Sequence, residues 1–161
     1  MKTKAIYPGS FDPITFGHLD LLKRSCKIFD DITIAVVVNP HKKPLCSVEE
    51  RLAMIKKATR GYGCIKIDKF DGLLVDYAKK INATVVIRGL RAIADFEYEF
   101  QMALVNRSLN KKLDMVYMMP SVEYTYLSSS IVRELASLHG DISRFVPESV
   151  EKLLKEKFKN V

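Results

Sequence analysis

Two pairs of basic side chains each follow an expected β-strand in this sequence. The pairs are Lys42 with Lys43 and Arg88 with Arg91. The carboxyl ends of parallel strands meet at one edge of a sheet, so we expect these four cations to converge there. Like charges repel at short range, and an anionic ligand such as a phosphate would relieve that repulsion. The alternative is that Lys and Arg are simply common in exposed loops.

Two expected helix starts lie at the same edge. The first, Thr15-Phe16-Gly17-His18, presents free backbone N–H groups that suit phosphate oxygens, and Gly17 lets a ligand approach the backbone closely. His18 projects from the first turn toward the same place, although such a histidine is more often a capping or packing residue than a catalytic one. The second start, Ser128–Ser130, offers hydroxyls and backbone donors together, but serine is also an ordinary N-cap. These features predict a phosphate-binding edge.

Strand-like and helix-like runs alternate from one end of the chain to the other. The expected strands are Lys4–Tyr7, Ile32–Val38, Ile65–Phe70, Thr84–Ile87 and Asp114–Met119. The expected helices begin near Gly17, Ser47, Gly72, Ala94, Ser128 and Pro147. Such alternation with short connections specifies right-handed, parallel β-α-β units. We therefore predict an α/β fold: a single Rossmann-like, doubly wound domain over residues 1–161, with a five-stranded parallel sheet and a C-terminal helical segment at about 128–160.

The composition places the chain among soluble globular proteins and excludes disordered or fibrous classes. Of 161 residues, 26 are Lys or Arg and 19 are Asp or Glu, and the net charge of +7 attracts anions in general without selecting a partner. No run approaches the roughly 18 apolar residues of a membrane span, and the N-terminus lacks a signal-peptide core. We therefore expect a cytoplasmic protein without membrane contact. The three cysteines, an odd number without a C-x-x-C pair, predict free thiols in a reducing compartment.

Several other chemistries lack their sequence patterns. There is no G-x-x-x-x-G-K-[ST] phosphate loop and no G-x-S-x-G hydrolase elbow. Gly61-Tyr62-Gly63 lacks the third glycine of a dinucleotide fingerprint and precedes a strand instead of following one. The histidines and cysteines lack zinc-ligand spacing, which leaves phosphate chemistry as the best-supported class.

Four separated motifs carry a family resemblance. Residues 7–18, Tyr-Pro-Gly-Ser-Phe-Asp-Pro-Ile-Thr-Phe-Gly-His, resemble the nucleotidyltransferase signature in its Thr-x-Gly-His form. The other motifs are Ile87-Arg-Gly-Leu-Arg91, Asp95-Phe-Glu-Tyr-Glu99 and Tyr126-Leu-Ser-Ser-Ser-Ile-Val-Arg133. In this order, from about residue 3 to residue 150, they resemble the bacterial phosphopantetheine adenylyltransferase family.

The resemblance implies a reaction and its partners. The family transfers, reversibly, the adenylyl group of ATP to 4′-phosphopantetheine, giving dephospho-coenzyme A and pyrophosphate in a late step of coenzyme A biosynthesis. The nucleophile is a phosphate whose second pKa is about 6, so it is mostly dianionic at neutral pH and needs no general base. Cations, helix N-termini and Mg²⁺ would supply alignment and charge neutralisation. The resemblance also implies Mg²⁺ as cofactor with unknown ligands, a homohexamer, and inhibition by coenzyme A.

The resemblance further assigns site residues by position. His18 would stabilise the transition state at the α-phosphate. Phosphopantetheine would be bound by Ser10, Lys42, Leu74 and Arg88. ATP would be bound by Ser10, Phe11, His18, Gly89, Leu90, Arg91, Glu99, Tyr124, Thr125, Tyr126, Leu127, Ser128, Ser129 and Ser130.

Two alternatives remain beside this interpretation. A related nucleotidyltransferase could act on another small phosphate acceptor, such as nicotinate mononucleotide or glycerol 3-phosphate, but the Thr-x-Gly-His form and the Arg88–Arg91 block favour phosphopantetheine. A basic nucleic-acid-binding domain would need cations that track one surface, whereas here they follow strand ends. We therefore expect no nucleic-acid partner.

Overall fold

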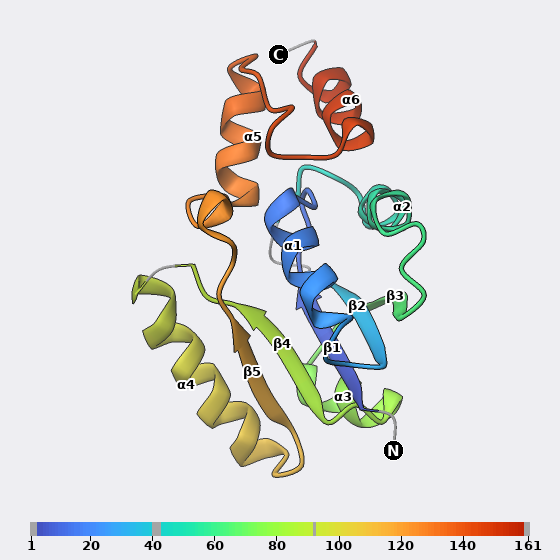
Figure 1. Ribbon diagram of the computed structural model, residues 1–161, viewed down its shortest axis with the longest axis vertical. Coiled ribbons are helices and arrows are strands. Elements are labelled where there is room, and N and C mark those ends of the chain that lie inside the picture. The colour runs from blue at the N-terminus through green and yellow to red at the C-terminus, as the bar shows by residue number, and fades with distance from the viewer. Residues whose placement is uncertain (1–2, 40–42, 92, 160–161) are drawn as a thin grey trace.

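A five-stranded, all-parallel sheet forms the centre of the protein in a computed structural model that describes residues 3–39, 43–91 and 93–159. The strands are β1 (Lys4–Gly9), β2 (Asp31–Val37), β3 (Ile65–Phe70), β4 (Val85–Gly89) and β5 (Asp114–Met118). Their order is β3-β2-β1-β4-β5, so the chain reverses its direction across the sheet between β1 and β4 (Figure 1). The predicted α/β fold with five parallel strands is confirmed, and ligands of such sheets bind where the order reverses.

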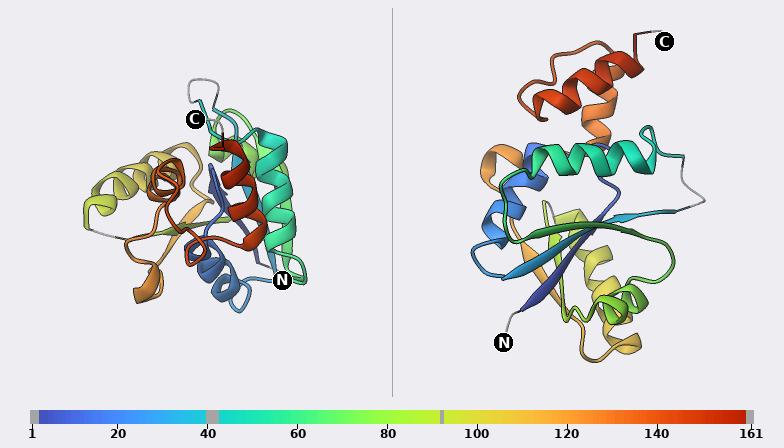
Figure 2. Two further views of the ribbon diagram at one scale, coloured as in Figure 1. Left: turned by 90° about the horizontal axis from the view of Figure 1, so that it is seen from above. Right: turned by 90° about the vertical axis from the view of Figure 1, so that its right-hand side faces the viewer.

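Helices cover both faces of the sheet and extend past one edge. They are α1 (Phe16–Ser25), α2 (Val48–Ala58), α3 (Leu74–Ile81), α4 (Ile93–Leu109), the 3₁₀ turn η1 (Val122–Tyr124), α5 (Ser129–Ser137) and α6 (Glu148–Lys157). Figure 2 shows α1 and α2 over one face and α3 and α4 over the other. In Figure 1, α5 and α6 lie beyond the carboxyl ends of the strands. Among the described residues, every helix is too short or too polar to cross a lipid bilayer.

The central strand β1 is apolar on both faces because both are covered. Ala5 and Tyr7 pack into the core beneath α1 and α2, whereas Ile6, on the opposite face, packs into a second core with Val75 and Ala78 of α3. Ile6 is fully buried, and Ala5 is nearly so. Burial on both faces explains why β1 is apolar at nearly every position. At its carboxyl end, β1 leads into a loop that lies between helices.

Local signals set the helix starts much as the sequence indicates. Ser47 caps α2 through a reciprocal box, in which Glu50 N–H donates to Ser47 Oγ at 3.1 Å and Ser47 N–H donates to Glu50 Oε2 at 2.7 Å. Pro147 is the N-cap of α6, one position before the helix.

Helix α5 buries one face and exposes apolar side chains on the other. Val132 and Ala136 are buried, whereas Ile131 is 41% exposed and Leu138 is 73% exposed. The contacts of the first turn with the loop after β1 fix the rotation of α5 and turn Val132 inward.

The expectation of three free thiols is wrong for two of them. Cys26 and Cys64 form a disulfide with a Cα–Cα distance of 6.0 Å. Cys26 follows α1 and Cys64 precedes β3, and the Ile32 N–H donates to Cys64 O at 2.8 Å, so strand pairing brings these distant positions together. Cys46 is free and buried, and burial together with the neighbouring Asp12 raises the pKa of its thiol to about 12.

Glycine at position 89 leaves room for the Leu21 side chain of α1 against β4. A Cβ added there would lie 2.6 Å from Leu21 Cδ1. We expect Gly89→Ala to lower the free energy of unfolding by about 1–3 kcal/mol through overpacking. Gly63→Ala is the matched control, because a Cβ at Gly63 meets nothing within 4 Å.

Chemical denaturation of both variants tests this expectation. Truncating the clashing partner in the double variant Leu21→Ala/Gly89→Ala should cost less than the sum of the two single changes, since the two sites are in contact. Strictly additive costs would contradict the steric explanation.

Candidate active site

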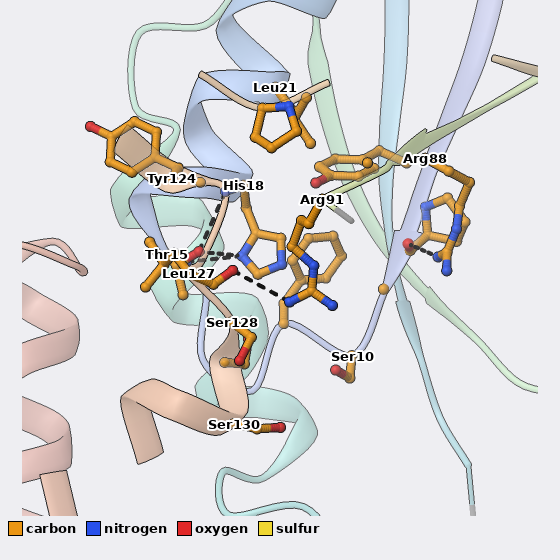
Figure 3. A pocket seen from close by; sticks show the side chains of 18 residues that line it. Ser10, Thr15, His18, Leu21, Arg88, Arg91, Tyr124, Leu127, Ser128 and Ser130 are labelled. Atoms are coloured by element: carbon orange, nitrogen blue, oxygen red, sulfur yellow. Dashed lines mark hydrogen bonds between the residues drawn. The ribbon is translucent and has the colours of Figure 1, made fainter. Parts of the chain in front are cut away.

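A cavity of about 310 Å³ lies at the carboxyl edge of the sheet, where the strand order reverses. Its walls come from the ends of β1 and β4, the first turns of α1 and α5, and the segment between β5 and α5 (Figure 3). Residues far apart in the sequence therefore share one wall. The lining residues are Tyr7, Pro8, Gly9, Ser10, Phe11, Thr15, Gly17, His18, Leu21, Arg88, Gly89, Arg91, Pro120, Tyr124, Leu127, Ser128, Ser129 and Ser130.

Most of the predicted site residues face this cavity. Those that line it are Ser10, Phe11, His18, Arg88, Gly89, Arg91, Tyr124, Leu127, Ser128, Ser129 and Ser130. Leu74, Leu90, Glu99, Thr125 and Tyr126 do not line it, and Lys42 lies outside the described residues. Leu74 is the first residue of α3, and Glu99 lies behind Arg88. The ligand roles of all these residues stay predictions.

Several lining residues are not among those predicted from the sequence, including Tyr7, Thr15, Leu21 and Pro120. Tyr7 and Thr15 belong to the motif at residues 7–18, so their membership was a usable signal. Leu21 carried no such signal, since an apolar residue on a helix usually belongs to the core.

Burial raises the pKa of the Tyr7 hydroxyl, and the charges of Arg88 and Arg91 offset part of that rise.

Reciprocal hydrogen bonds with Thr15 hold the His18 ring. The Thr15 backbone N–H donates to His18 Nδ1 at 3.0 Å, and the His18 backbone N–H donates to Thr15 Oγ1 at 3.4 Å. Thr15 Oγ1 also lies 2.9 Å from Nδ1. Because a backbone N–H can only donate, Nδ1 is an acceptor, and the proton of the neutral ring is on Nε2. In Figure 3 the opposite side of the ring faces the cavity beside Arg91.

The environment keeps His18 uncharged. Burial, followed by the charges of Arg91 and Arg88, lowers its pKa from 6.5 to about 4. At physiological pH the imidazole therefore stays neutral, and its Nε2–H is a hydrogen-bond donor. His18 is therefore suited to donate to an anion and unsuited to act as a general acid there.

The two cavity arginines each have a carboxylate partner from α4. Arg88 Nε donates to both carboxylate oxygens of Glu99 at 3.0 and 3.1 Å, Arg88 Nη2 also contacts Glu99, and Arg88 Nη1 donates to Pro8 O at 3.1 Å. Burial lowers the pKa of Arg88, but the hydrogen bonds and charge of Glu99 outweigh this effect and raise it. Arg91 pairs with Asp95 at 3.3 Å.

These ion pairs contradict the expectation that repulsion between the cavity cations calls for an anionic ligand. Repulsion between Arg88 and Arg91 is relieved by Glu99 and Asp95, so it does not by itself require a bound anion. The phosphate-site interpretation depends instead on donors. A guanidinium has five N–H groups, and Arg88 retains donors beyond those that Glu99 and Pro8 use.

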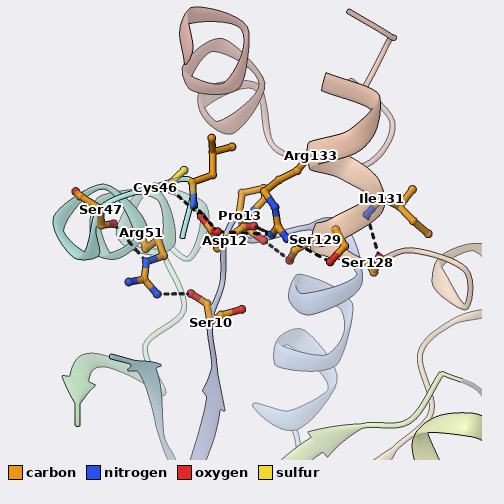
Figure 4. A network of polar contacts seen from close by, with 12 residues as sticks. Ser10, Asp12, Pro13, Cys46, Ser47, Arg51, Ser128, Ser129, Ile131 and Arg133 are labelled. Carbon is orange, nitrogen blue, oxygen red and sulfur yellow. Dashed lines mark hydrogen bonds and ion pairs between the residues drawn. The ribbon is translucent and has the colours of Figure 1, made fainter. Parts of the chain in front are cut away.

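A buried carboxylate joins the loop after β1 to two helices (Figure 4). Asp12, 4% exposed, accepts the backbone N–H groups of Leu45 at 2.9 Å and Cys46 at 2.8 Å. Arg133 of α5 lies 3.6 Å from the same carboxylate and donates to Asp12 O. Ser129 Oγ donates to Pro13 O at 2.7 Å. The start of α5 is thereby fixed against the loop that carries Ser10 and Phe11.

The described residues contain no cluster of three or more His, Cys, Asp or Glu side chains that could hold a metal ion. The lining side chains supply cations, hydroxyls and an imidazole, and the described lining residues include no carboxylate. These groups bind phosphate oxygens, whereas Mg²⁺ takes oxygen ligands, commonly one or two carboxylates with substrate phosphates. The wall does not form a protein-held magnesium site.

Comparisons with known proteins agree on one family. The family model described as cytidylyltransferase-like matches residues 6–135. The phosphopantetheine adenylyltransferase of Caldanaerobacter subterraneus is 53% identical over 155 residues, which are 96% of this chain and 97% of that protein. The enzyme of the same name from Geobacter metallireducens is 54% identical over 154 residues, 96% of this chain and 94% of that protein.

A solved structure shares the fold. It is provisionally described as a nicotinate-nucleotide adenylyltransferase from Vibrio parahaemolyticus, and it matches with a TM-score of 0.72 at 19% sequence identity. The match covers 100% of this chain and 98% of that one. At this identity the likeness extends to the fold alone.

The His18 geometry predicts its protonation state. We expect long-range ¹H–¹⁵N correlation spectra to show the proton on Nε2 and no titration of His18 between pH 8 and about pH 5.5, with His18→Gln used for assignment. Between pH 6.5 and about 4, His18 binds a proton in the unfolded chain but not in the folded protein. The contribution of His18 to the free energy of unfolding therefore falls as the pH falls through this range. A His18 signal that titrates near pH 6.5 would contradict the proposed environment.

Proposed function

This chain belongs to the phosphopantetheine adenylyltransferase family, and from that premise we infer that it transfers the adenylyl group of ATP to 4′-phosphopantetheine. The products are dephospho-coenzyme A and pyrophosphate. The observation that carries the proposal for the site is the set of donors that face one cavity: His18, Arg88, Arg91 and the start of α5. All of them suit phosphate oxygens, and His18, whose Nε2 carries the ring proton, is a donor there and not a nucleophile.

In the proposed mechanism the acceptor phosphate attacks the α-phosphorus of ATP in line, and pyrophosphate leaves from the opposite side. The bond formed joins an acceptor oxygen to the α-phosphorus, and the bond broken is the one between the α-phosphorus and the bridging oxygen. The dianionic acceptor already carries the electron pair, so the site's task is alignment and charge stabilisation. A cavity lined by donors and without an activated nucleophile fits this task.

We assign to His18 the stabilisation of the negative charge that develops on the α-phosphate. Its Nε2–H donor is held by Thr15 through Nδ1, so the ring needs no reorientation during the reaction. A preorganised donor of this kind contributes most where charge increases in the transition state. Arg91, anchored by Asp95 and by a hydrogen bond to Leu127 O at 3.4 Å, would bind the triphosphate beside it.

The remaining phosphate contacts divide between the two substrates. The start of α5, with Ser128 as N-cap and Ser129 and Ser130 in the first turn, would hold the β- and γ-phosphates. Arg88, reached from the end of β4, would hold the acceptor phosphate together with Lys42. Ser10, which follows β1 at the reversal of the strand order, would contact both substrates.

We also propose that Mg²⁺ arrives bound to the phosphates of ATP, which supplies oxygen ligands that the cavity wall lacks. Such an ion neutralises phosphate charge when bound, and no step above depends on it. Inhibition by coenzyme A follows as a proposal from its chemistry, because coenzyme A contains the pantetheine and adenylate parts of the product dephospho-coenzyme A. A cytoplasmic location is proposed because ATP is its substrate.

Helix α4 supports the proposal of a homohexamer. Its exposed large apolar side chains are Phe96, Tyr98, Phe100, Leu104, Val105 and Leu109, each at least half exposed. Phe96 and Phe100 stack on each other with ring centroids 5.8 Å apart. An apolar surface of this kind on one helix is typical of a contact with another protein, and we assign it to further copies of this chain.

The function is tested by incubating the purified protein with ATP, Mg²⁺ and 4′-phosphopantetheine and measuring pyrophosphate release. We expect turnover that requires all three. We expect His18→Ala to lower kcat by about 10²–10³ with a smaller change in KM for ATP, because its hydrogen bond strengthens in the transition state. Near-normal kcat with a much raised KM would assign His18 to substrate binding instead. Circular dichroism controls for folding.

The assembly is tested by light scattering after size-exclusion chromatography. We expect the wild type at about six times the chain mass of 18.3 kDa. Leu104→Arg should shift the protein to smaller species, since it places a charge in the apolar surface of α4. Ile28→Arg is the matched control, because Ile28 is 62% exposed but lies away from α4. A wild-type monomer at micromolar concentration would refute the assembly.

A further inference from the structure

Arg51 of α2 is a buried cation without a carboxylate partner. The residue is 3% exposed, and none of the described carboxylates lies within 4.0 Å of it. Burying a charge costs free energy that backbone dipoles recover only in part. A long apolar side chain would fill the same space without that cost. Arg51 therefore needs an explanation beyond packing.

Within the described residues, the Arg51 side chain donates three hydrogen bonds, all to backbone carbonyls on different segments. Nε donates to Ser47 O at 3.3 Å, and Nη1 donates to Ser10 O at 3.0 Å and to Val37 O at 3.4 Å. Ser47 is the N-cap of α2, Ser10 follows β1, and Val37 ends β2. One guanidinium thus ties the ends of two neighbouring strands to the helix that begins between β2 and β3, as Figure 4 shows for Ser10.

Holding the Ser10 carbonyl also sets the direction of the next peptide N–H. In a trans peptide the C=O and the following N–H point in opposite directions. The Ser10 carbonyl accepts from Arg51 of α2, so the Phe11 N–H points away from Arg51, and Phe11 itself lines the cavity. That N–H donates to no group among the described residues. It is a free donor beside a phosphate-binding cavity.

The backbone at Phe11 requires support. Its φ of +46° lies in the left-handed region, which costs a residue with a side chain roughly 1–2 kcal/mol. Such a conformation persists only where its surroundings fix it, and it is common where a backbone N–H must face an anion. Arg51 holds the carbonyl immediately before this residue, while the Phe11 ring is 1% exposed and packs against Tyr7 and His18.

We propose that Arg51 is a positioning residue for adenylyl transfer: by holding the Ser10 carbonyl it aims the Phe11 N–H at a phosphate oxygen in the cavity. The proposal rests on the function inferred above. Arg51 itself touches no substrate. Loss of its contacts would let the Ser10–Phe11 peptide rotate, and a donor that acts on developing charge would be misaligned.

The test uses Arg51→Met, which keeps length and removes charge and donors, and Arg51→Lys, which keeps charge but has one donor centre. Ile55→Val is the matched control, because Ile55 is fully buried on the same helix and its truncation lowers stability without removing a hydrogen bond to the Ser10 carbonyl. Melting temperature, kcat and both KM values are measured for the full-length proteins, with pyrophosphate release assayed well below the lowest melting temperature.

We expect Arg51→Met to lower kcat by about 10–100-fold while both KM values change less than about threefold, with Arg51→Lys intermediate. Ile55→Val should keep the wild-type kcat even where its melting temperature falls as far. A merely structural role predicts the same kcat per folded molecule in all variants.

A kcat for Arg51→Met within about threefold of the wild type, or no lower than that of Ile55→Val, overturns the proposal. If Arg51→Met does not fold, Arg51→Lys decides by the same criterion, and wild-type kcat in that variant overturns it. An inactive wild-type protein would refute the proposed function itself, so the two failures are distinguishable.

Discussion

The buried Asp12 carboxylate is the constraint on which the rest of the site depends. It accepts the backbone N–H groups of Leu45 and Cys46 before α2, and it lies 3.6 Å from Arg133 of α5. Breaking such a buried network by removing one partner costs several kcal/mol, because the others lose their compensation. The loop after β1 is therefore tied on both sides, to α2 through Asp12 and Arg51 and to α5 through Arg133. A cavity between β1, β4, α1 and α5 keeps its shape only while this loop keeps its place.

The site balances its charges without a ligand. Glu99 and Asp95, both on α4, neutralise the two cavity arginines, and Tyr117 Oη donates to Glu99 O at 2.7 Å, which fixes that part of the helix. The arginines can thus be preorganised in the free protein instead of repelling one another. Because α4 also carries the exposed apolar side chains, the helix that supports the arginines is the same one that would contact another copy of the chain.

Burial and the same arginines together set the protonation state of His18. The loss of solvent, followed by the positive charges of Arg91 and Arg88, disfavours the imidazolium, so the ring stays neutral and donates through Nε2. A charged histidine would attract phosphate more strongly in the ground state. A neutral histidine donates the same hydrogen bond without first having to take up a proton. The Thr15 capping box makes this possible, since one set of hydrogen bonds both begins α1 and fixes the tautomer.

The sequence by itself determined the order of strands and helices, the sheet edge that carries the site, and the family. Apolar runs and caps such as Ser47 are local signals: a run marks a strand that is covered on both faces, and a cap depends on the hydrogen bonds of its own turn. Only the tertiary structure decided the pairing of Arg88 with Glu99, the Cys26–Cys64 disulfide and the face that α5 buries. Each depends on which side chains meet after the sheet has assembled, and no spacing along the chain encodes that. In the sequence, Arg51 looks like any polar residue of an amphipathic helix. Its partners are backbone carbonyls, and because every residue has a backbone carbonyl, no residue type marks them.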